Sequence, residues 1–323
     1  MNYNGLTRRA TLGAASAFWA SAPARAQPAW PTRPIRIIIP FGPGGSPDTV
    51  TRRMAEHWTA ALRQPVVIDN RPGGGGVVAT EAIARAAPDG YTFGIGNAGP
   101  LSTSPALEPN LPYHPVRDFT HLAMLAEFPL AIAVASNGPV RDVRDLLALG
   151  RTKQGGVDVG TPGTAGPRLV LELMRQRYGA VVTIVPYRGG TSAGTEVVAG
   201  RLDAAVASFG EFAGNDRLRV IAMLSDDRHP TRPEIPTLRE QGFDVTFNVT
   251  FWLLAPALLP ELIAARATTL VDEAMRLPET VSLATRIGAM PYRPIFSPAL
   301  TSMLVEDNAR WSEVVRAGNL RSE

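Results

Sequence analysis

The sequence has no cysteine among its 323 residues. This excludes disulfide bonds, thiolate zinc sites and cysteine nucleophiles. Lysine is nearly absent as well, because Lys153 is the only one. Lysine Schiff-base chemistry, or the lysine of a phosphate-binding loop, would therefore depend on Lys153 alone. Because Lys153 lies in the polar turn sequence RTKQGG, we expect its side chain to be solvated.

A large net charge is also absent once the first residues are set aside. Residues 7–26 start with paired arginines, continue with a short apolar stretch and end in Ala24-Arg25-Ala26, which predicts an export signal cleaved after Ala26. The apolar stretch is too short to span a membrane, and the paired arginines resemble a twin-arginine signal. Removing the three arginines of this leader lowers the formal charge from +3 to zero. We therefore expect an exported protein that does not bind nucleic acid.

No internal repeat or low-complexity linker interrupts the chain. Its residues are 45% hydrophobic and 19% charged, which is typical of a globular protein large enough for two domains. Apolar runs of strand length alternate with amphipathic stretches of helix length, and this predicts α/β units around mostly parallel sheets. We expect strands at 35–40, 66–69, 92–95, 122–126, 131–135, 157–160, 182–185, 204–207, 220–223 and 251–254. We expect helices at 49–62, 77–86, 143–150, 168–178, 195–199, 260–276, 279–287 and 298–317.

Glycine, by contrast, gathers in loops that follow predicted strands. Glycine allows positive φ angles and close approach to the backbone, and the helix start beyond it offers unpaired N–H groups. In parallel sheets, such loops lie at the edge where ligands bind. Each loop alone is equally typical of an ordinary turn, but together they favour a shared cleft. They are FGPGGSPD (41–48), NRPGGGG (70–76), GNAGP (96–100), TPGTAGP (161–167) and YRGGTSAG (187–194).

Two patterns that resemble cofactor or metal sites lack the right context. Residues 94–99 fit G-x-G-x-x-G, but four prolines follow between residues 100 and 112, so we do not expect the long helix that a nucleotide site requires. His114, Asp118 and His121 come near metal-ligand spacing on a proline-bounded segment with no regular face, which favours solvated or capping roles. We therefore predict neither a metal nor a cofactor.

A serine hydrolase is the enzyme alternative. Residues 190–194 fit G-x-S-x-G, and Asp226 and His229 follow in the order of an α/β-hydrolase triad. The nucleophile of that motif should follow its strand directly, whereas YRGG separates Ser192 from the predicted strand. This context favours a protein that is not an enzyme.

Side chains at the starts of predicted helices have two compatible roles. Asp48, Thr164 and Ser192 each stand where a loop turns into a helix, which is typical of an N-cap. A cap leaves other N–H groups for a ligand carboxylate or phosphate. Arg188 is placed to pair with an anion, and Arg168 follows TPGTAGP at the start of its helix. Backbone N–H groups and an arginine at these positions suit the binding of a small carboxylate in a cleft.

Longer motifs, in a fixed order, resemble a known family. They are WPTRPIRIIIPFGPGGSPDTVTRRMAEHWTAALRQPVVIDNRPGGGG, AAPDGYTFGIGNAG, LPYHPVRDF, VPYRGG and GRLDAAVAS. From about Trp30 onward the chain resembles the extracytoplasmic solute receptors of tripartite tricarboxylate transporters, the Bug family of periplasmic binding proteins. This resemblance implies a two-lobed Venus-flytrap α/β fold, with a mostly parallel sheet flanked by helices in each lobe. Residues 27–128 and 250–323 would form lobe 1, and residues 129–249 would form lobe 2.

The resemblance also implies which loop residues bind the ligand, through backbone groups and bridging waters. In lobe 1 the matching residues are Phe41, Gly44, Gly45, Ser46, Asp48, Asn97 and Ala98. In lobe 2 they are Thr161, Gly163, Thr164, Ala165, Tyr187, Arg188 and Gly189.

The sequence departs from the family pattern twice in lobe 2. Arg168 stands where the family usually has a histidine. After GRLDAAVAS the chain is shortened to FGEFAGNDRLRV before the next strand, so we expect Ser208, Phe209 and Glu211 to line an altered pocket.

The implied function is that of a monomeric receptor. It would capture a small organic carboxylate between its lobes and deliver it to membrane transporter subunits. A ligand sensor for a membrane signalling kinase would share the same cleft, and the sequence leaves that alternative open.

Overall fold

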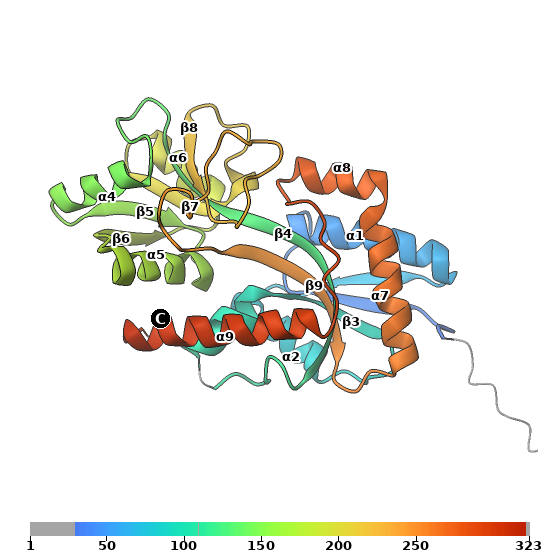
Figure 1. Cartoon of the computed structure of the whole chain (residues 1–323). Coiled ribbons are helices and arrows are strands. Elements are labelled where there is room, and N and C mark those ends of the chain that lie inside the picture. Colours follow the sequence, from blue (N-terminus) through green and yellow to red (C-terminus); the bar gives the residue numbers. More distant parts are fainter. Residues whose placement is uncertain (1–29, 109, 321–323) are drawn as a thin grey trace, which may run out of the picture.

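The strands form one mixed sheet that runs through the whole molecule (Figure 1). The computed structural model describes residues 30–108 and 110–320, so the predicted export signal at residues 1–26 lies outside the described residues. The strands are β1 (Ile35–Ile39), β2 (Val66–Asn70), β3 (Thr92–Asn97), β4 (Phe119–Ala135), β5 (Val157–Thr161), β6 (Val182–Pro186), β7 (Ala204–Ser208), β8 (Leu218–Met223) and β9 (Asn248–Pro256).

α-Helices of 4 to 19 residues connect or follow these strands. They are α1 (Ser46–Leu62), α2 (Val77–Ala84), α3 (Ser104–Leu107), α4 (Val143–Thr152), α5 (Ala165–Tyr178), α6 (Gly190–Val198), α7 (Glu261–Arg276), α8 (Pro278–Arg286) and α9 (Ala299–Ala317). Three short helical turns are η1 (Gly74–Gly76), η2 (Gly99–Thr103) and η3 (Phe209–Glu211).

The sheet has two halves joined by two long strands. Its order is β2-β1-β3-β9-β4-β7-β5-β6, with β8 paired to β4 outside this path. β1 pairs in parallel with β2 and β3, and β5 pairs in parallel with β6 and β7. All pairs made by β4 and β9 are antiparallel. We call β2, β1, β3, β9 and the start of β4 the first half, and the end of β4 with β5 to β8 the second half.

β4 crosses from one half to the other without a break. Residues 122–126 and 131–135, predicted as separate strands, belong to this single 17-residue strand. Its first part pairs with β9 as far as Pro129, and its last part pairs with β7 from Leu130 onward. Proline lacks a backbone donor, but here it stands where one ladder ends and the next begins, so the strand continues. Both predicted lobe boundaries fall within β4 and β9, and that division stays a prediction.

Two helices begin earlier than predicted because glycines inside them pack closely. α5 begins at Ala165 instead of 168, and α6 begins at Gly190 instead of 195. A Cβ added at Gly166 would lie 2.5 Å from the ring of Phe247, and one added at Gly190 would lie 2.2 Å from the Cβ of Ala207. Glycine therefore serves close packing at these positions, where the sequence pattern indicates a loop.

Amphipathic helices cover both faces of the first half. Val50, Met54 and Trp58 of α1 are buried at helical spacing and pack with one face of β1. Ile38 points to the opposite face of β1, where it packs with residues of α2 and α9. Because successive side chains of a strand point to opposite faces of the sheet, the core of this half is divided into two layers.

The C-terminal helix α9 links the two halves. Leu304, near its start, packs in the first half, whereas Trp311 is fully buried in the core of the second half. The Trp311 ring lies 5.5 Å from the ring of Phe247, centroid to centroid. Gln176 of α5 donates to the carbonyl oxygen of Val314 at 3.0 Å. Figure 1 shows the end of α9 beside α5, so the last helix of the chain supports both halves.

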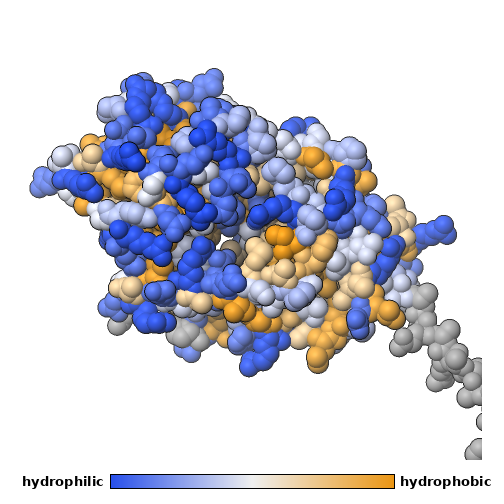
Figure 2. Space-filling model, in the orientation of Figure 1, coloured by the Kyte–Doolittle hydropathy of each residue, from blue (hydrophilic) through white to orange (hydrophobic). Residues whose placement is uncertain are grey.

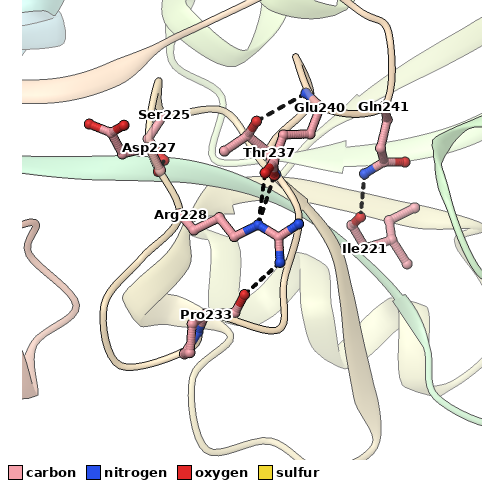
Figure 3. Close-up of polar contacts among 8 residues, drawn as sticks. All are labelled: Ile221, Ser225, Asp227, Arg228, Pro233, Thr237, Glu240 and Gln241. Atoms are coloured by element: carbon pink, nitrogen blue, oxygen red, sulfur yellow. Dashed lines mark hydrogen bonds and ion pairs between the residues drawn. The ribbon is translucent and has the colours of Figure 1, made fainter.

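Polar contacts hold the long connection between β8 and β9 (Figure 3). Arg228 donates to both carboxylate oxygens of Glu240 at 2.9 Å and to the carbonyl oxygen of Pro233 at 2.7 Å. The Glu240 carboxylate also accepts a hydrogen bond from the N–H of Thr237 at 2.7 Å. The loop is therefore fixed although it lacks a long helix or strand.

A second contact between the halves lies beside this loop. His229 is fully buried, and its Nε2 donates to the carbonyl oxygen of Ala289 at 3.1 Å. The ring of His229 lies 4.9 Å from that of Phe209. Next to Phe209, a Cβ added at Gly210 would lie 2.4 Å from the carbonyl oxygen of Ile287. Only glycine fits this approach of two backbones.

Substitution of Gly210 tests this contact. Gly210→Ala should destabilise the protein by about 1 to 3 kcal/mol, since two backbone segments must separate to admit the methyl group. The melting temperature, followed by circular dichroism, should fall by a few degrees. Gly42→Ala is the matched control, because its added Cβ would meet nothing within 4 Å. Equal melting temperatures for the two variants would contradict the close approach.

Candidate functional site

The glycine loops gather at two edges of the sheet. β1, β2 and β3 run parallel and in register, so the loops that follow them share one edge of the first half. β5, β6 and β7 place the loops that follow them at one edge of the second half. Loops at the carboxyl ends of parallel strands are the usual ligand-binding positions of α/β proteins.

The first glycine loop is built around the carboxylate of Asp48, which is 2% exposed. Its Oδ2 accepts hydrogen bonds from the Gly44 N–H at 2.9 Å and from Arg52 Nε at 2.8 Å. Its Oδ1 accepts one from Asn70 Nδ2 at 2.9 Å. Asn70 also donates to the carbonyl oxygen of Phe41 at 2.9 Å. Asp48 therefore shapes the loop from within, and its carboxylate is engaged by the protein itself.

The same contacts set the charge state of Asp48. Burial alone would raise the pKa of its carboxyl group, but hydrogen bonds from Arg52, Gly44 and Asn70 outweigh burial and hold the pKa below the ordinary value of 3.8. The carboxylate is therefore ionised at neutral pH and keeps its three donors.

Two of the three predicted N-cap assignments are wrong. The N-cap of α1 is Gly45 and that of α6 is Gly189, so Asp48 and Ser192 lie inside the first turns. Thr164 is the N-cap of α5, as predicted, although its side chain makes no capping hydrogen bond. Glycine is also a common N-cap residue, and a sequence rule that favours polar caps passes over it.

The start of α1 keeps backbone donors available. The first intrahelical bond runs from the Thr49 N–H to the Gly45 carbonyl oxygen at 2.9 Å. The N–H groups of Ser46 and Asp48 precede it without a side-chain cap, and Pro47 between them has no N–H. Unpaired donors at the positive end of a helix attract an anion.

Asn97 ends β3 at the same edge. It is 8% exposed, and its Oδ1 has no hydrogen-bond partner among the described residues. The amide lies over Gly99, where an added Cβ would be 3.3 Å from Oδ1. An unpaired buried amide oxygen costs about 1 to 3 kcal/mol, so a donor from a ligand or water is expected here. The neighbouring Ala98 packs in the core of the second half.

In the second half, the predicted residues after β5 and β6 form one group. The N–H of Tyr187 donates to the carbonyl oxygen of Thr161 at 2.8 Å. Gly163 has a φ of +66°, and a Cβ there would lie 3.3 Å from the carbonyl oxygen of Tyr187. Thr164 and Ala165 follow at the start of α5. The structure thus brings these five residues together.

A pocket of about 580 Å³ opens beside this group. Its walls come from both halves of the molecule, which is typical of a site between two lobes. They include Thr161, Gly163, Thr164, Ala165 and Arg168 from the second half and Leu107 and Glu108 from the first.

The remaining predicted residues surround the start of α6. Arg188 is exposed and has no hydrogen bond or ion pair with the described residues. Gly189 is the N-cap of α6, and Ser208 is the last residue of β7. In the following turn η3, the carboxylate of Glu211 accepts a hydrogen bond from the N–H of Gly190 at 2.6 Å.

The predicted site residues form two groups, one in each half. No hydrogen bond in the described ranges joins residues 41–48 directly to residues 161–165 or 187–189. The link runs through Ala98 and η2, which contacts α5. A ligand between the edges would bridge the two groups.

The residues of the hydrolase alternative are engaged elsewhere. Ser192 is exposed on α6. His229 is buried, and both of its ring nitrogens have partners: Nε2 bonds to Ala289 and Nδ1 lies 2.8 Å from Thr231 Oγ1. Asp226 pairs with an arginine. This arrangement leaves neither ring nitrogen of His229 available to activate Ser192.

The histidine grouping has structural roles. His121 is buried, its Nδ1 accepts from Trp252 Nε1 at 2.9 Å, and its Nε2 donates to the carbonyl oxygen of Pro115 at 3.0 Å. Burial lowers the pKa of His121 to about 4. His114 Nδ1 accepts from nearby backbone N–H groups. Across the described part of the chain, no group of three His, Cys, Asp or Glu side chains is placed to hold a metal ion.

The prediction that Lys153 is simply solvated is wrong. Its ammonium donates to Asp158 at 2.8 Å and to Asp203 at 2.5 Å, and these contacts raise the pKa of Lys153. The single lysine therefore links the starts of β5 and β7 and is committed to structure.

Sequence reasoning missed two residues that complete the first loop. Asn70 ties β2 to the loop, and Arg52 returns from the second turn of α1 to Asp48. The signal for Arg52 was its spacing of four residues from Asp48, which is the spacing of helical ion pairs. Asn70 is the first residue of the glycine loop NRPGGGG, and the glycine pattern does not indicate its contact with Asp48.

Comparison with known proteins identifies the family. The model of the tripartite tricarboxylate transporter family receptor matches residues 50–320. The protein BugT of Bordetella pertussis is 31% identical over 294 residues, which cover 89% of this chain and 90% of BugT. Within the described residues, no helix has the length and hydrophobicity that a membrane crossing requires.

Solved structures share the fold. MatC from Rhodopseudomonas palustris with bound malate has a TM-score of 0.74 and 28% identity, covering 88% of this chain and 99% of MatC. R. palustris Rpa4515 with adipate has a TM-score of 0.76 and 26% identity, covering 90% and 99%. A structure of a periplasmic transporter has a TM-score of 0.77 and 27% identity, covering 91% and 99%. These matches confirm the predicted periplasmic-binding-protein fold, and the chain belongs to the tripartite tricarboxylate transporter receptor family, the group that includes the Bug proteins.

Proposed function

We propose that the protein is a periplasmic solute receptor that captures a small organic carboxylate and delivers it to a tripartite tricarboxylate-type transporter. The observation that carries this proposal is the buried amide oxygen of Asn97, which lacks a hydrogen-bond partner among the described residues and lies at the sheet edge that also carries the uncapped start of α1. An unpaired acceptor and unpaired backbone donors at one edge suit a hydrated carboxylate, because a bridging water can donate to Asn97 while the N–H groups bind the anion.

Arg188 supports binding from the other half. It is exposed on the loop after β6 and makes no ion pair among the described residues. A guanidinium at this place can pair with the carboxylate seated in the first half. Contacts from both halves are required if the ligand is to stabilise a closed state, and we propose that the halves move as lobes divided near Phe128 and Val249.

The relatives support the ligand class. Malate and adipate, bound in two of the solved structures, are both small organic carboxylates. The predicted export signal at residues 1–26 supports a periplasmic location, and family membership supports a transporter as the partner.

A thermal-shift screen of the chain from Gln27, against small carboxylates and their neutral amides, tests the proposal. At 100 times the dissociation constant, a ligand adds about 2.7 kcal/mol of stability, which raises the melting temperature by about 5 to 10 °C. Asn97→Leu should abolish this shift and leave the free protein as stable or more stable, because an apolar group replaces an unpaired amide. Absence of a shift with every acid would sink the receptor proposal.

Arg188→Ala should weaken binding of the acid found in that screen by about tenfold, since one charge-assisted hydrogen bond is lost. Isothermal titration calorimetry gives the affinity. The control is Arg151→Ala, which removes an arginine that is also exposed but lies on α4; it should leave the affinity unchanged. Equal affinities for the two variants would remove Arg188 from the site.

The role of Asp48 predicts a pH dependence. Its pKa is depressed in the folded state, so its stabilising effect is fully present well above the ordinary pKa of 3.8 and is lost as the pH falls through the lower folded-state pKa. Asp48→Asn should therefore cost about 1 to 3 kcal/mol at pH 7, and the difference from wild type should shrink toward pH 3. Urea unfolding at pH 7 and pH 3 measures it.

The control for this experiment is Asp216→Asn, because Asp216 is exposed and has no hydrogen-bond partner in the described part of the chain. It should unfold like wild type at both pH values. A loss of stability in Asp48→Asn that is the same at pH 7 and pH 3 would contradict an ionised Asp48.

A further inference from the structure

The helix that begins at the second-half site carries its own carboxylate. α1 and α5 start without a side-chain cap. At the start of α6, by contrast, Oε2 of Glu211 accepts hydrogen bonds from the N–H of Gly190 at 2.6 Å and from the N–H of Thr191 at 3.3 Å. Glu211 comes from η3, which follows the neighbouring strand β7. The position where α6 would bind an anion is therefore already filled.

The structure holds Glu211 firmly in this place. The residues on either side of the Gly210–Glu211 pair, Phe209 and Phe212, are each only 2% exposed. Gly210 packs against the backbone of Ile287. A Cβ at Gly190 would lie 2.9 Å from both the Cδ and Oε2 of Glu211. Glycine at the start of α6 thus makes room for the carboxylate, and buried aromatic rings fix its direction.

Glu211 still has an unused acceptor. Both hydrogen bonds go to Oε2, and Oε1 accepts none from the described residues. Arg188 lies on the same loop as Gly190 but forms no ion pair with Glu211. The start of α6 therefore offers a negative charge and a free acceptor, while Arg188 remains available for an anion.

This arrangement discriminates between ligands. A second ligand carboxylate near the start of α6 would lie close to the Glu211 carboxylate, and two like charges close together in a partly desolvated site repel each other. A hydroxyl, amide or ammonium group would instead donate to Oε1. A ligand that offers no donor would leave Oε1 of Glu211 without a hydrogen bond. An unpaired polar group in a site discriminates against the wrong ligand more strongly than a difference in apolar contact does.

We propose that Glu211 determines specificity: it selects a ligand with one carboxylate, held in the first half, and a hydrogen-bond donor at its other end, and it rejects dicarboxylates. This inference rests on the proposed receptor function and narrows its substrate class.

Calorimetry with matched probes tests the inference. Succinate, glutarate and adipate are each compared with the monoamide of the same length, and glutarate also with 5-hydroxypentanoate. The wild-type protein should bind the monoamide or hydroxy acid at least about tenfold more tightly than the diacid of that length. Glu211→Gln keeps the shape and an acceptor for the Gly190 N–H but removes the charge, so diacid affinity should rise by about tenfold.

Glu196→Gln is the matched control. Glu196 lies on the same helix, but it pairs with Arg201 beyond the other end of α6. The same chemical change there should leave the preference between diacid and monoamide as it is in the wild type.

The outcomes separate the two proposals. If wild type binds a diacid as tightly as its monoamide, or if Glu211→Gln keeps the wild-type preference, the inference about Glu211 is wrong and the receptor function stands. If the wild-type protein binds no acid of any kind, both the proposed receptor function and the inference about Glu211 are wrong. The wild-type comparison needs no variant, so the inference can be tested even if Glu211→Gln does not fold.

Discussion

The antiparallel ladder between β4 and β9 is the interaction on which the rest of the structure depends. It is the one stretch of backbone pairing that continues from the first half of the sheet to the point where the second half begins. The parallel strands on each side take their direction from it, and their carboxyl ends carry the glycine loops. The relative placement of the two groups of candidate binding residues therefore depends on β4 and β9, the strands that pass between the two halves.

Each half then adds a different kind of polar device to its edge. The first half engages the Asp48 carboxylate inside a loop, and at the same edge the buried Oδ1 of Asn97 has no hydrogen-bond partner among the described residues. The second half places the carboxylate of Glu211 against the start of α6, while Arg188 forms no ion pair with any described residue. The carboxylates of Asp48 and Glu211 thus determine which backbone N–H groups remain available to a ligand, because each carboxylate already accepts a hydrogen bond from a loop or helix N–H group.

Periodicity and glycine spacing predicted much of the fold: every expected helix is present in the described ranges, and every expected strand overlaps an observed one, although two of them belong to β4. The errors came from tertiary packing. A proline such as Pro129 normally indicates the end of a strand, but here it lies between two ladders and β4 continues. Gly166 and Gly190 belong to predicted loops, but they lie inside helices, where they allow close approach of the Phe247 ring to α5 and of β7 to α6. These contacts lie between residues distant in the sequence, and local patterns carry no trace of them.

The positions of the candidate binding loops were predictable from the sequence, whereas the contacts inside them were not; their role in ligand binding stays a prediction. The loops after the parallel strands lie where the pattern placed them, but a list of matching residues could not show that the Asp48 carboxylate faces inward or that Asn70 holds it. The hydrogen bond from Gly190 to Glu211 joins residues on two different loops, and only their folded positions reveal it.

Self-capping of α6 has a consequence for the thermodynamics of association. A helix whose first N–H groups are paired before any ligand arrives is preorganised, so the ligand does not have to order that turn. The conformational entropy of this turn is lost when the protein folds, so its loss does not oppose binding. During folding, burial of the rings of Phe209 and Phe212 compensates for this entropy cost. Recognition at the second half should therefore resemble the docking of a rigid surface, with little change in backbone order at α6.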